Sequence, residues 1–408
     1  MTKFLRWSAA ILVTALTVGS ARAQDSEGSH QIRHVWVITL ENEGFDATFG
    51  SASKAPYLSK TLKSQGVLLT QYYGTGHTSL DNYVAMISGQ AATVETRNDC
   101  QIYADFIQTG TTADGQAIGH GCVYPANVKT LADQLTAAGK TWRAYMEDMG
   151  NDPSRESSVC GHPVLNTQDL TQSAEAPSAS VPLGDAYATR HNGFAYFHSI
   201  IDSPACANVV NLNQMATDLK SASSTPAVSF ITPSLCHDGH DAPCADKEPG
   251  GLISADAFLQ RWVPMITGSP AFHNGLLIIN FDEGGLSISP NPAGGFTILA
   301  EGETCCSERK GPNLGSFPQT AMIGAYTLTF GSYGGDRTGA VLLSPFVRPG
   351  SISNTGFNHY SLLKTIEHIF GLGYLGFAGA PGLVPVFGCA VSDVASNLPG
   401  SHCGSGGE

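Results

Sequence analysis

Several short segments of this sequence concentrate side chains that could hold a cation or attack a phosphate-like group. They are Glu41-Asn42, Ser79, the run 236–241 (CHDGHD), Asp282-Glu283 and His359. Adjacent carboxylates such as Asp282 and Glu283 repel each other unless a cation lies between them, so this pair predicts metal ligation. The run CHDGHD places potential ligands close together and predicts a metal-binding or phosphate-binding loop.

Ser79 lies near the start of an expected helix. In the stretch 74–90, GTGHTSLDNYVAMISGQ, the apolar side chains of Tyr83, Met86 and Ile87 follow the i, i+3, i+4 spacing of a helix face. Unpaired backbone N–H groups and the positive end of the helix dipole could hold an oxyanion there while Ser79 attacks it. The alternative is a capping role, because Ser and Thr are common N-cap residues.

The elements that must position these side chains alternate between strand and helix. Short apolar runs predict strands at 34–40, 67–72, 141–146, 227–232, 276–281 and 339–347. Apolar stripes predict helices at 56–63, 128–138, 253–266 and from 359 onwards. This alternation is typical of an α/β fold with a mostly parallel sheet. In such sheets ligands bind at the C-terminal ends of the strands, where Glu41-Asn42 and Asp282-Glu283 follow their strands.

Together these groups form a set suited to hydrolysis, because oxygen-rich ligands would lie near a hydroxyl nucleophile. A bound metal would lower the pKa of the Ser79 hydroxyl and bind the substrate oxygen. The histidines would hold phosphoryl oxygens or protonate the leaving group. The set favours phosphoryl transfer through a covalent phosphoserine that water later hydrolyses.

The N-terminus resembles an export signal. Lys3 and Arg6 precede an apolar run at 9–18 and the sequence Ala21-Arg22-Ala23, which predicts a signal peptide over residues 1–23. The apolar run is too short to span a bilayer comfortably, and no other run approaches the roughly 18 residues required, so no transmembrane anchor is expected. We therefore expect a periplasmic or secreted protein.

The mature chain is expected to be acidic and disulfide-bonded. Its formal charge of −13 becomes −16 (−13 − 3) when Lys3, Arg6 and Arg22 leave with the signal. A basic nucleic-acid footprint is absent, so we expect no nucleic acid as a regulatory partner. An anionic substrate would need a local cationic centre, which points to a metal.

All 10 cysteines lie beyond residue 23 without a CxxC pair, which favours disulfides over a metal cluster. Pairing of Cys236 with Cys244, or of Cys389 with Cys403, fits the spacing. The adjacent Cys305 and Cys306 are expected to reach different partners.

A single α/β domain is expected over 24–408. It would carry long insertions near 148–192 and 286–320, the second a Gly/Pro/Ser-rich loop, and a Cys-containing C-terminal tail.

The order of the motifs is similar to that of a known family. A strand followed by LENEGFDATFG, then GHTSLDNYVAMISGQ, CHDGHD, FDEGG and HYSLLKTIEHIFGL, resembles the bacterial phosphoesterase family of secreted acid phosphatases and non-haemolytic phospholipases C. That family belongs to the alkaline phosphatase superfamily. The resemblance extends over residues 33–375 and implies an alkaline-phosphatase-like, three-layer α/β sandwich with helices flanking the sheet.

The resemblance also implies roles for individual residues. The metal ligands would be Glu41, Asn42, Asp282 and Glu283, with Ser79 as nucleophile and further metal contact. Substrate phosphate would meet Asn42, His191 of the segment RHNGFAYF, Asp238, His240 and His359, with His240 and His359 also in catalytic roles. Either Asn98 or Asp99 is a further candidate. The metal would be one divalent ion, Ca, Mg, Mn, Zn or Fe, with room for a second.

Two departures accompany the resemblance. Asp81 stands where many superfamily members carry proline, and Thr78 leaves the choice of nucleophile open by one residue.

The sequence therefore predicts an exported, metal-dependent phosphomonoesterase of acid-phosphatase type, acting on a phosphate ester of a small molecule or a phospholipid headgroup. A phospholipase C or other phosphodiesterase using the same site is the nearest alternative. An exported protein that captures phosphate or metal without turnover is a second. A sulfatase is disfavoured because SLDNY lacks the C/S-x-P-x-R context of such enzymes.

Overall fold

The central element is an eight-stranded sheet in the order β14-β2-β13-β8-β1-β7-β5-β6. The computed structural model describes residues 32–291, 295–323 and 326–387, so the expected signal peptide lies outside it. Only β13 runs antiparallel to its neighbours in this sheet, which confirms the mostly parallel sheet expected from the sequence. The strands are β1 (His34–Leu40), β2 (Val67–Tyr73), β5 (Trp142–Met146), β6 (Val209–Asn211), β7 (Val228–Thr232), β8 (Gly275–Phe281), β13 (Ala340–Leu343) and β14 (Ser351–Asn358).

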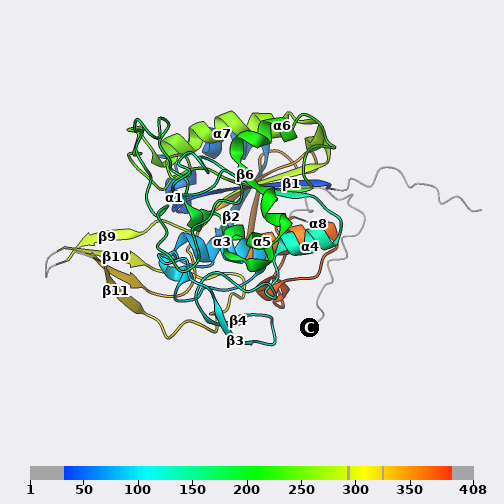
Figure 1. Cartoon of the computed structure of the whole chain (residues 1–408). Coiled ribbons are helices and arrows are strands. Elements are labelled where there is room, and N and C mark those ends of the chain that lie inside the picture. Colours follow the sequence, from blue (N-terminus) through cyan, green and yellow to red (C-terminus); the bar gives the residue numbers. More distant parts are fainter. Residues whose placement is uncertain (1–31, 292–294, 324–325, 388–408) are drawn as a thin grey trace, which may run out of the picture.

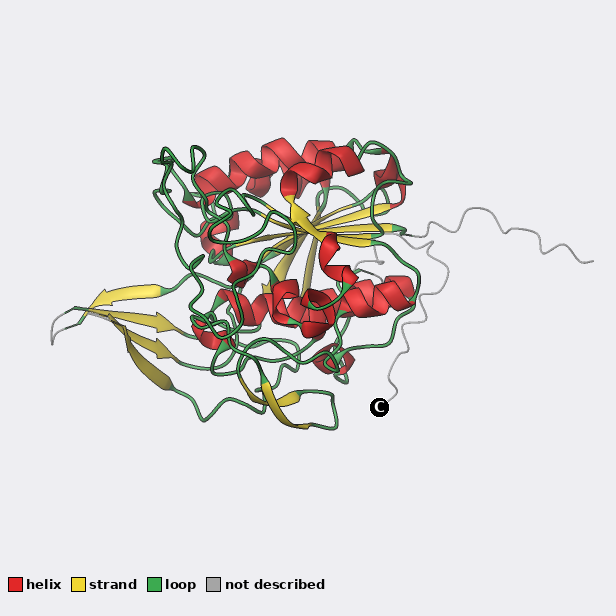
Figure 2. Cartoon of the chain, in the orientation of Figure 1, coloured by secondary structure: helices red, strands yellow, loops and turns green. Residues whose placement is uncertain are grey.

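Helices cover both faces of this sheet and make the three-layer sandwich (Figures 1 and 2). One layer holds α3 (Ser79–Ser88), α4 (Leu131–Ala137), α5 (His198–Ile201) and α8 (His359–Phe370). The other holds α1 (Phe45–Phe49), α2 (Lys63–Gln65), α6 (Met215–Asp218) and α7 (Gly251–Thr267). The expected helix at 56–63 is a π-helical turn, η1 (Tyr57–Leu62), that runs into α2.

Strand β1 shows why the sheet needs two helical layers. Val35 and Val37 pack into the core beneath α3, α4 and α8, whereas Trp36 and Ile38 pack against α7. Successive side chains of a strand point to opposite faces, so a strand buried on both faces has a continuous apolar sequence. The run HVWVITL is such a strand, and it occupies the middle of the sheet between β7 and β8.

Short 3-10 helices join these elements: η2 (Thr96–Asn98), η3 (Thr189–His191), η4 (Gly193–Tyr196), η5 (Pro204–Asn208), η6 (Leu212–Gln214), η7 (Pro270–Asn274) and η8 (Gly376–Gly379). A small antiparallel hairpin pairs β3 (Ile107–Thr111) with β4 (Ala117–His120). No helix in the described part of the chain is long and apolar enough to cross a membrane.

The segment 286–320 was expected to be a loop, and this prediction is wrong. It contributes to a separate four-stranded sheet in the order β11-β12-β10-β9, which projects from the body in Figure 1. Its strands are β9 (Ser287–Pro290), β10 (Phe296–Ala300), β11 (Gln319–Ile323) and β12 (Tyr326–Phe330). The strands were not predicted because they are only four or five residues long and lie between Gly- and Pro-rich connections.

Four disulfides occur among the described residues: Cys100–Cys122, Cys160–Cys206, Cys236–Cys244 and Cys305–Cys306. The pairing of Cys236 with Cys244 is confirmed. The expectation that Cys305 and Cys306 reach different partners is wrong, because they bond to each other in a turn that packs on Gly356 of β14. The pair Cys389 and Cys403 lies outside the described residues.

A buried carboxyl on α8 gives stability a predictable pH dependence. Burial raises the pKa of Glu367 to about 8, while its Oε1 accepts a hydrogen bond from Leu375 N at 2.8 Å. Between pH 4.5 and 8 the folded chain therefore keeps a proton that the unfolded chain releases, so this group makes stability fall as pH rises through that window.

We expect Glu367→Gln to leave the free energy of unfolding nearly unchanged at pH 4.5 and to raise it by on the order of a few kcal/mol at pH 8. Urea unfolding at the two pH values measures the difference, with the exposed Glu301→Gln as control. An equal effect of Glu367→Gln at both pH values would show that this carboxyl does not titrate in the window.

Candidate functional site

The polar segments predicted from the sequence meet at one edge of the central sheet. Glu41-Asn42 follow β1, the CHDGHD loop follows β7, and Asp282-Glu283 follow β8. Backbone hydrogen bonds continue past the strand ends, from Glu41 N to Asp238 O at 2.9 Å and from Asp282 N to Leu40 O at 2.9 Å. The carboxylates are thereby held close together by the sheet itself.

A glycine permits the close approach of the CHDGHD loop. Gly239 has a φ of 116°, and a Cβ there would lie 2.8 Å from the carbonyl oxygen of Glu41. A larger residue would be strained in this conformation and would push the loop away. The loop can therefore bring Asp238 against Glu41.

Glu41 is the centre of the site. It is fully buried, and its Oε2 accepts a hydrogen bond from Ser79 Oγ at 2.8 Å. Its Oε1 accepts one from the hydroxyl of Tyr83 at 2.5 Å. His191 Nε2 lies 3.4 Å from Oε2, and His191 Nδ1 lies 3.2 Å from Asp238 Oδ2.

Ser79 is the first residue of α3, as predicted, and it faces this carboxylate. Thr78 is the N-cap residue, but its hydroxyl donates to Asp81 Oδ2 at 3.2 Å and lies 3.4 Å from the carbonyl of Thr96. Of the two candidate nucleophiles, Ser79 is the one whose hydroxyl contacts Glu41.

The site gathers more negative charge than its own cations neutralise. Burial raises the pKa of Glu41 well above its ordinary value, and Asp282 and Asp238 raise it further. Burial, followed by the charge of Glu283, likewise raises the pKa of Asp282, and burial raises that of Asp238 to about 7. Carboxylates in this arrangement repel one another, and a bound cation would relieve the repulsion.

Unsatisfied polar atoms in the site fit a metal ion. The buried atoms Asn42 Oδ1, Asp238 Oδ2, Asp282 Oδ2 and Glu283 Oε2 have no hydrogen-bond partner among the described residues. Buried polar atoms rarely stay unpaired without a ligand or water. Ligand atoms of Glu41, His191 and Asp238 all lie within 4.8 Å of one another. Carboxylate and amide oxygens with an imidazole suit a divalent cation.

Asn42 has an unusual backbone conformation, with a φ of 57°. Asn tolerates this left-handed region better than most residues. The conformation lets its N–H donate to Asp282 Oδ1 at 3.0 Å, and Glu283 N donates to the same oxygen at 2.7 Å. Two backbone donors therefore orient one oxygen of Asp282 and leave the other for a ligand.

His359 lies behind this cluster and is fully buried. Its Nε2 contacts the carbonyl oxygen of Asp282 at 2.5 Å, and its Nδ1 contacts the hydroxyl of Tyr72 at 3.0 Å. Burial lowers the pKa of His359 to about 4, which keeps the ring neutral. With both nitrogens engaged by the protein, His359 is arranged to position Asp282 and does not face the open side of the site.

His240 and Arg190 form a cationic side of the site. Arg190 Nη2 lies 3.5 Å from His240 Nε2, and Arg190 Nε lies 3.8 Å from Asp99 Oδ2. Burial would lower the pKa of His240, but its hydrogen bond with Asp241 and the charge of Asp238 raise it overall. His240 is partly exposed, so this is the side from which an anion can approach the carboxylates.

Asp99, one of the two further candidates, binds the backbone of α3. Its Oδ1 accepts from Leu80 N at 3.0 Å, in the first turn of the helix that begins at Ser79.

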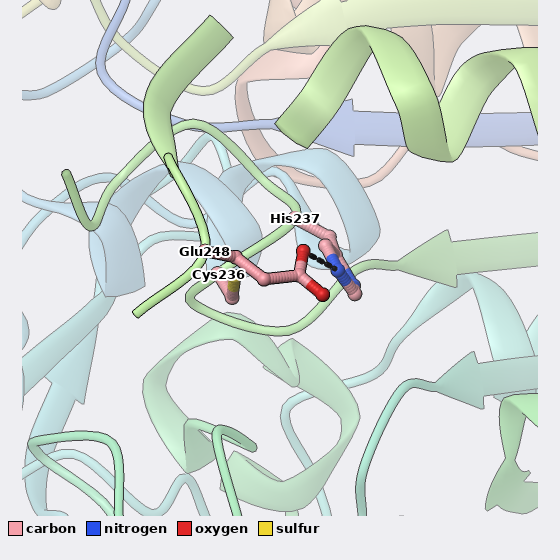
Figure 3. A group of neighbouring side chains, drawn as sticks. All are labelled: Cys236, His237 and Glu248. Atoms are coloured by element: carbon pink, nitrogen blue, oxygen red, sulfur yellow. Dashed lines mark ion pairs between the residues drawn. The ribbon is translucent and has the colours of Figure 1, made fainter. Parts of the chain in front are cut away.

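His237 of the same loop turns away from the site. Its Nδ1 lies 2.9 Å from Glu147 Oε2. Its Nε2 lies 3.5 Å from Glu248 Oε2, the ion pair drawn in Figure 3. The neighbouring Cys236 is bonded to Cys244, so its sulfur is not a metal ligand. His237 therefore stabilises the loop, whereas Asp238 and His240 contact residues of the site.

Sequence reasoning missed several members of the site. Tyr83 was counted as part of an apolar stripe, although its hydroxyl reaches Glu41. His77 lies 2.8 Å from Asp336 Oδ2 and 3.7 Å from Glu283 Oε2; burial would lower its pKa, but these carboxylates raise it to about 10. His77 and Arg190 are each within two residues of a predicted site residue, which was the available signal. No motif marks Asp336.

Comparisons with known proteins relate this chain to phosphoesterases and phosphatases. A family model described as the phosphoesterase family matches residues 52–373. A phosphate-repressible acid phosphatase of Penicillium chrysogenum is 27% identical over 263 residues, which are 64% of this chain and 50% of that protein. A phosphatidylinositol-3-phosphatase of Mycobacterium tuberculosis is 23% identical over 87% of this chain and 83% of its own. The chain spans about half the length of the fungal acid phosphatases it matches.

Solved structures with a similar fold include murine ectonucleotide pyrophosphatase/phosphodiesterase 5, which is 12% identical with a TM-score of 0.44 over 84% of this chain and 96% of that one. An alkaline phosphatase superfamily protein from Vibrio parahaemolyticus is 11% identical with a TM-score of 0.44, over 84% and 67% of the respective chains. Since the family model matches most of the chain, across the segments that carry Ser79 and Asp282-Glu283, this protein belongs to the phosphoesterase family.

Proposed function

We propose that this protein is a metal-dependent phosphomonoesterase of acid-phosphatase type that works through a phosphoserine. The observation that carries the proposal is Ser79, a hydroxyl at the start of α3 that donates to Glu41 within a buried group of carboxylates. The names of its relatives, acid phosphatases among them, support a phosphoric ester substrate.

The metal ligands in this proposal are Glu41, Asn42, Asp282 and Glu283, with Ser79 in contact with the same ion. Their support is the set of unpaired buried oxygens at Asn42, Asp282 and Glu283. His191 and Asp238, which converge with Glu41, are the residues that a second ion would use. A divalent ion supplies charge neutralisation at the phosphoryl oxygens and lowers the pKa of the serine hydroxyl.

The remaining steps belong to the chain's own residues. Ser79 Oγ attacks phosphorus as its proton passes to Glu41, which already accepts its hydrogen bond. His240, protonated beside Asp241 and Asp238, gives a proton to the departing ester oxygen as the P–O bond breaks. Water then attacks phosphorus, its proton returns to His240, and Ser79 leaves with the proton from Glu41 to release inorganic phosphate. Arg190 and the backbone N–H of Ser79 at the start of α3 hold the phosphoryl oxygens.

We also propose that the protein is exported to the periplasm or beyond. The pattern of residues 1–23 supports this, as do the four disulfides among the described residues, which persist in oxidising compartments.

The proposal is tested by hydrolysis of a chromogenic phosphomonoester and the matching phosphodiester, each before and after chelation. We expect monoester turnover that a chelator abolishes and one divalent cation restores, because the carboxylates need a cation to act as a site. Faster turnover of the diester would favour the phosphodiesterase alternative. Full activity in the chelated protein, with metal shown absent by elemental analysis, would contradict metal dependence.

A further inference from the structure

The projecting sheet β9–β12 has one apolar face. In its register Ile298 of β10 pairs with Ile288 of β9 and with Leu328 of β12, and Ala300 pairs with Phe330. Paired residues, and residues two apart on one strand, share a face. Phe296, Ile298 and Ala300 therefore lie on the same face as their partners. The opposite face carries the hydroxyl side chains of Ser287, Ser289, Thr297 and Thr329, together with Leu299.

The apolar face is buried only where the sheet joins the body. Ala300 and Phe330 are 1% and 5% exposed, whereas Phe296 and Ile288 farther out are 44% and 64% exposed. Leu286, two residues before Ile288, is 40% exposed. Contiguous exposed apolar side chains of this kind mark interaction surfaces. We call Leu286, Ile288, Phe296, Ile298 and Leu328 the apolar face.

A series of contacts connects the base of this face to the candidate site. At its base the Arg97 guanidinium stacks over the Phe330 ring, 4.6 Å from the ring centroid, and bonds to the side chain of Gln319. The preceding residue, Thr96, contacts the hydroxyl of Thr78, next to Ser79. The chain also runs directly from Glu283 through Gly284-Gly285 into Leu286. A molecule bound along the face would thus hold its polar end near the carboxylates.

The composition of the sheet limits the kind of partner that would suit it. Residues 284–300 and 311–335 contain no Asp, Glu, Lys or Arg, although the whole chain carries a formal charge of −13. Protein interfaces usually include charged residues at their rim, and Arg within them. A surface of aliphatic, aromatic and hydroxyl side chains without charge matches the boundary between lipid headgroups and hydrocarbon. Anionic lipids would repel the acidic body of the protein, so the lipid surface that suits this sheet is one without net charge.

We propose that the apolar face of the β9–β12 sheet binds the surface of a zwitterionic phospholipid bilayer and so presents lipid phosphate esters to the site. The presentation of esters rests on the function proposed above, but binding to the bilayer does not require turnover. Failure of one is therefore distinguishable from failure of the other.

The test uses the mature chain and sedimentation with phosphatidylcholine vesicles. The double variant Ile288→Ser/Phe296→Ser removes two exposed apolar side chains, and Ile352→Ser on β14, which is 56% exposed, is the matched control. We expect the wild type and Ile352→Ser to bind equally and the double variant to bind roughly tenfold or more weakly, since large apolar side chains dominate such binding. Replacing part of the lipid with an anionic phospholipid should weaken binding of the wild type.

Vesicle binding by the double variant equal to that of the wild type would overturn the proposal, as would absence of binding by the wild type. A wild type that forms dimers dissociated by Ile288→Ser/Phe296→Ser, without binding vesicles, would assign the face to a second copy instead. Hydrolysis of a water-soluble monoester, measured in parallel, reports on the proposed function alone.

Discussion

Ser79→Ala abolishes turnover, with an expected loss of at least about a thousandfold in kcat, because the variant has no oxygen to attack phosphorus. Binding of the divalent cation and of inorganic phosphate should survive, since Glu41, Asp282 and Arg190 remain in place. The measurement is steady-state hydrolysis of a chromogenic monoester, with phosphate binding followed by calorimetry on the same sample. This combination separates an enzyme from a protein that captures phosphate without turnover.

Thr78→Ala is the matched control for Ser79→Ala. Its hydroxyl contacts Asp81 and Thr96 rather than Glu41, so we expect only a small change in kcat. If Thr78→Ala removed activity while Ser79→Ala retained it, Thr78 would be the nucleophile. Trapping labelled phosphate on the protein in acid and locating the modified residue gives a second measure of the same choice.

Asp282→Asn should lower metal affinity and turnover together, by several kcal/mol of transition-state stabilisation, roughly a thousandfold. The asparagine can still accept the hydrogen bonds that Asn42 N and Glu283 N now give to Oδ1. What it loses is the charge and the second, unpaired oxygen. Metal content by elemental analysis and kcat at limiting and saturating cation are the two measurements.

Asp256→Asn is the control for Asp282→Asn. Asp256 is also a buried carboxylate that accepts from two backbone N–H groups, those of Tyr57 and Leu58, but it lies on α7 away from the site. It should change stability without changing metal content. Unchanged metal content and turnover in Asp282→Asn would remove Asp282 from the ligand set.

The buried strands and their polar C-terminal neighbours were predictable from the sequence because burial on both faces leaves a continuous apolar run. His34–Leu40 and Gly275–Phe281 are such runs, and the residues after them are the predicted Glu41-Asn42 and Asp282-Glu283. By contrast, β14 (Ser351–Asn358) is an edge strand with an irregular polar sequence, and β6 (Val209–Asn211) is too short to show a period. Neither was predicted.

Site residues were predictable where the residue type alone indicates chemistry. The prediction was incomplete where membership of the site depends on the three-dimensional position of a residue. Motifs in the sequence indicate the carboxylates and Ser79. Asp336, by contrast, reaches the site from a loop after the projecting sheet, far along the chain from its partner His77. Likewise, nothing in the sequence shows that the two ring nitrogens of His359 would contact Asp282 and Tyr72. Such contacts depend on long-range packing that no local pattern encodes.

The backbone hydrogen bonds that continue past the ends of β1 and β8 affect the stability of the folded protein. By holding carboxylates together in its interior, the fold creates electrostatic repulsion that a bound cation would relieve. A ligand that binds only the native state adds to its stability by mass action. If the protein is the metal-dependent enzyme proposed above, the cation would determine how long each molecule persists as well as whether it reacts, and scarcity of the ion would lower the amount of folded protein.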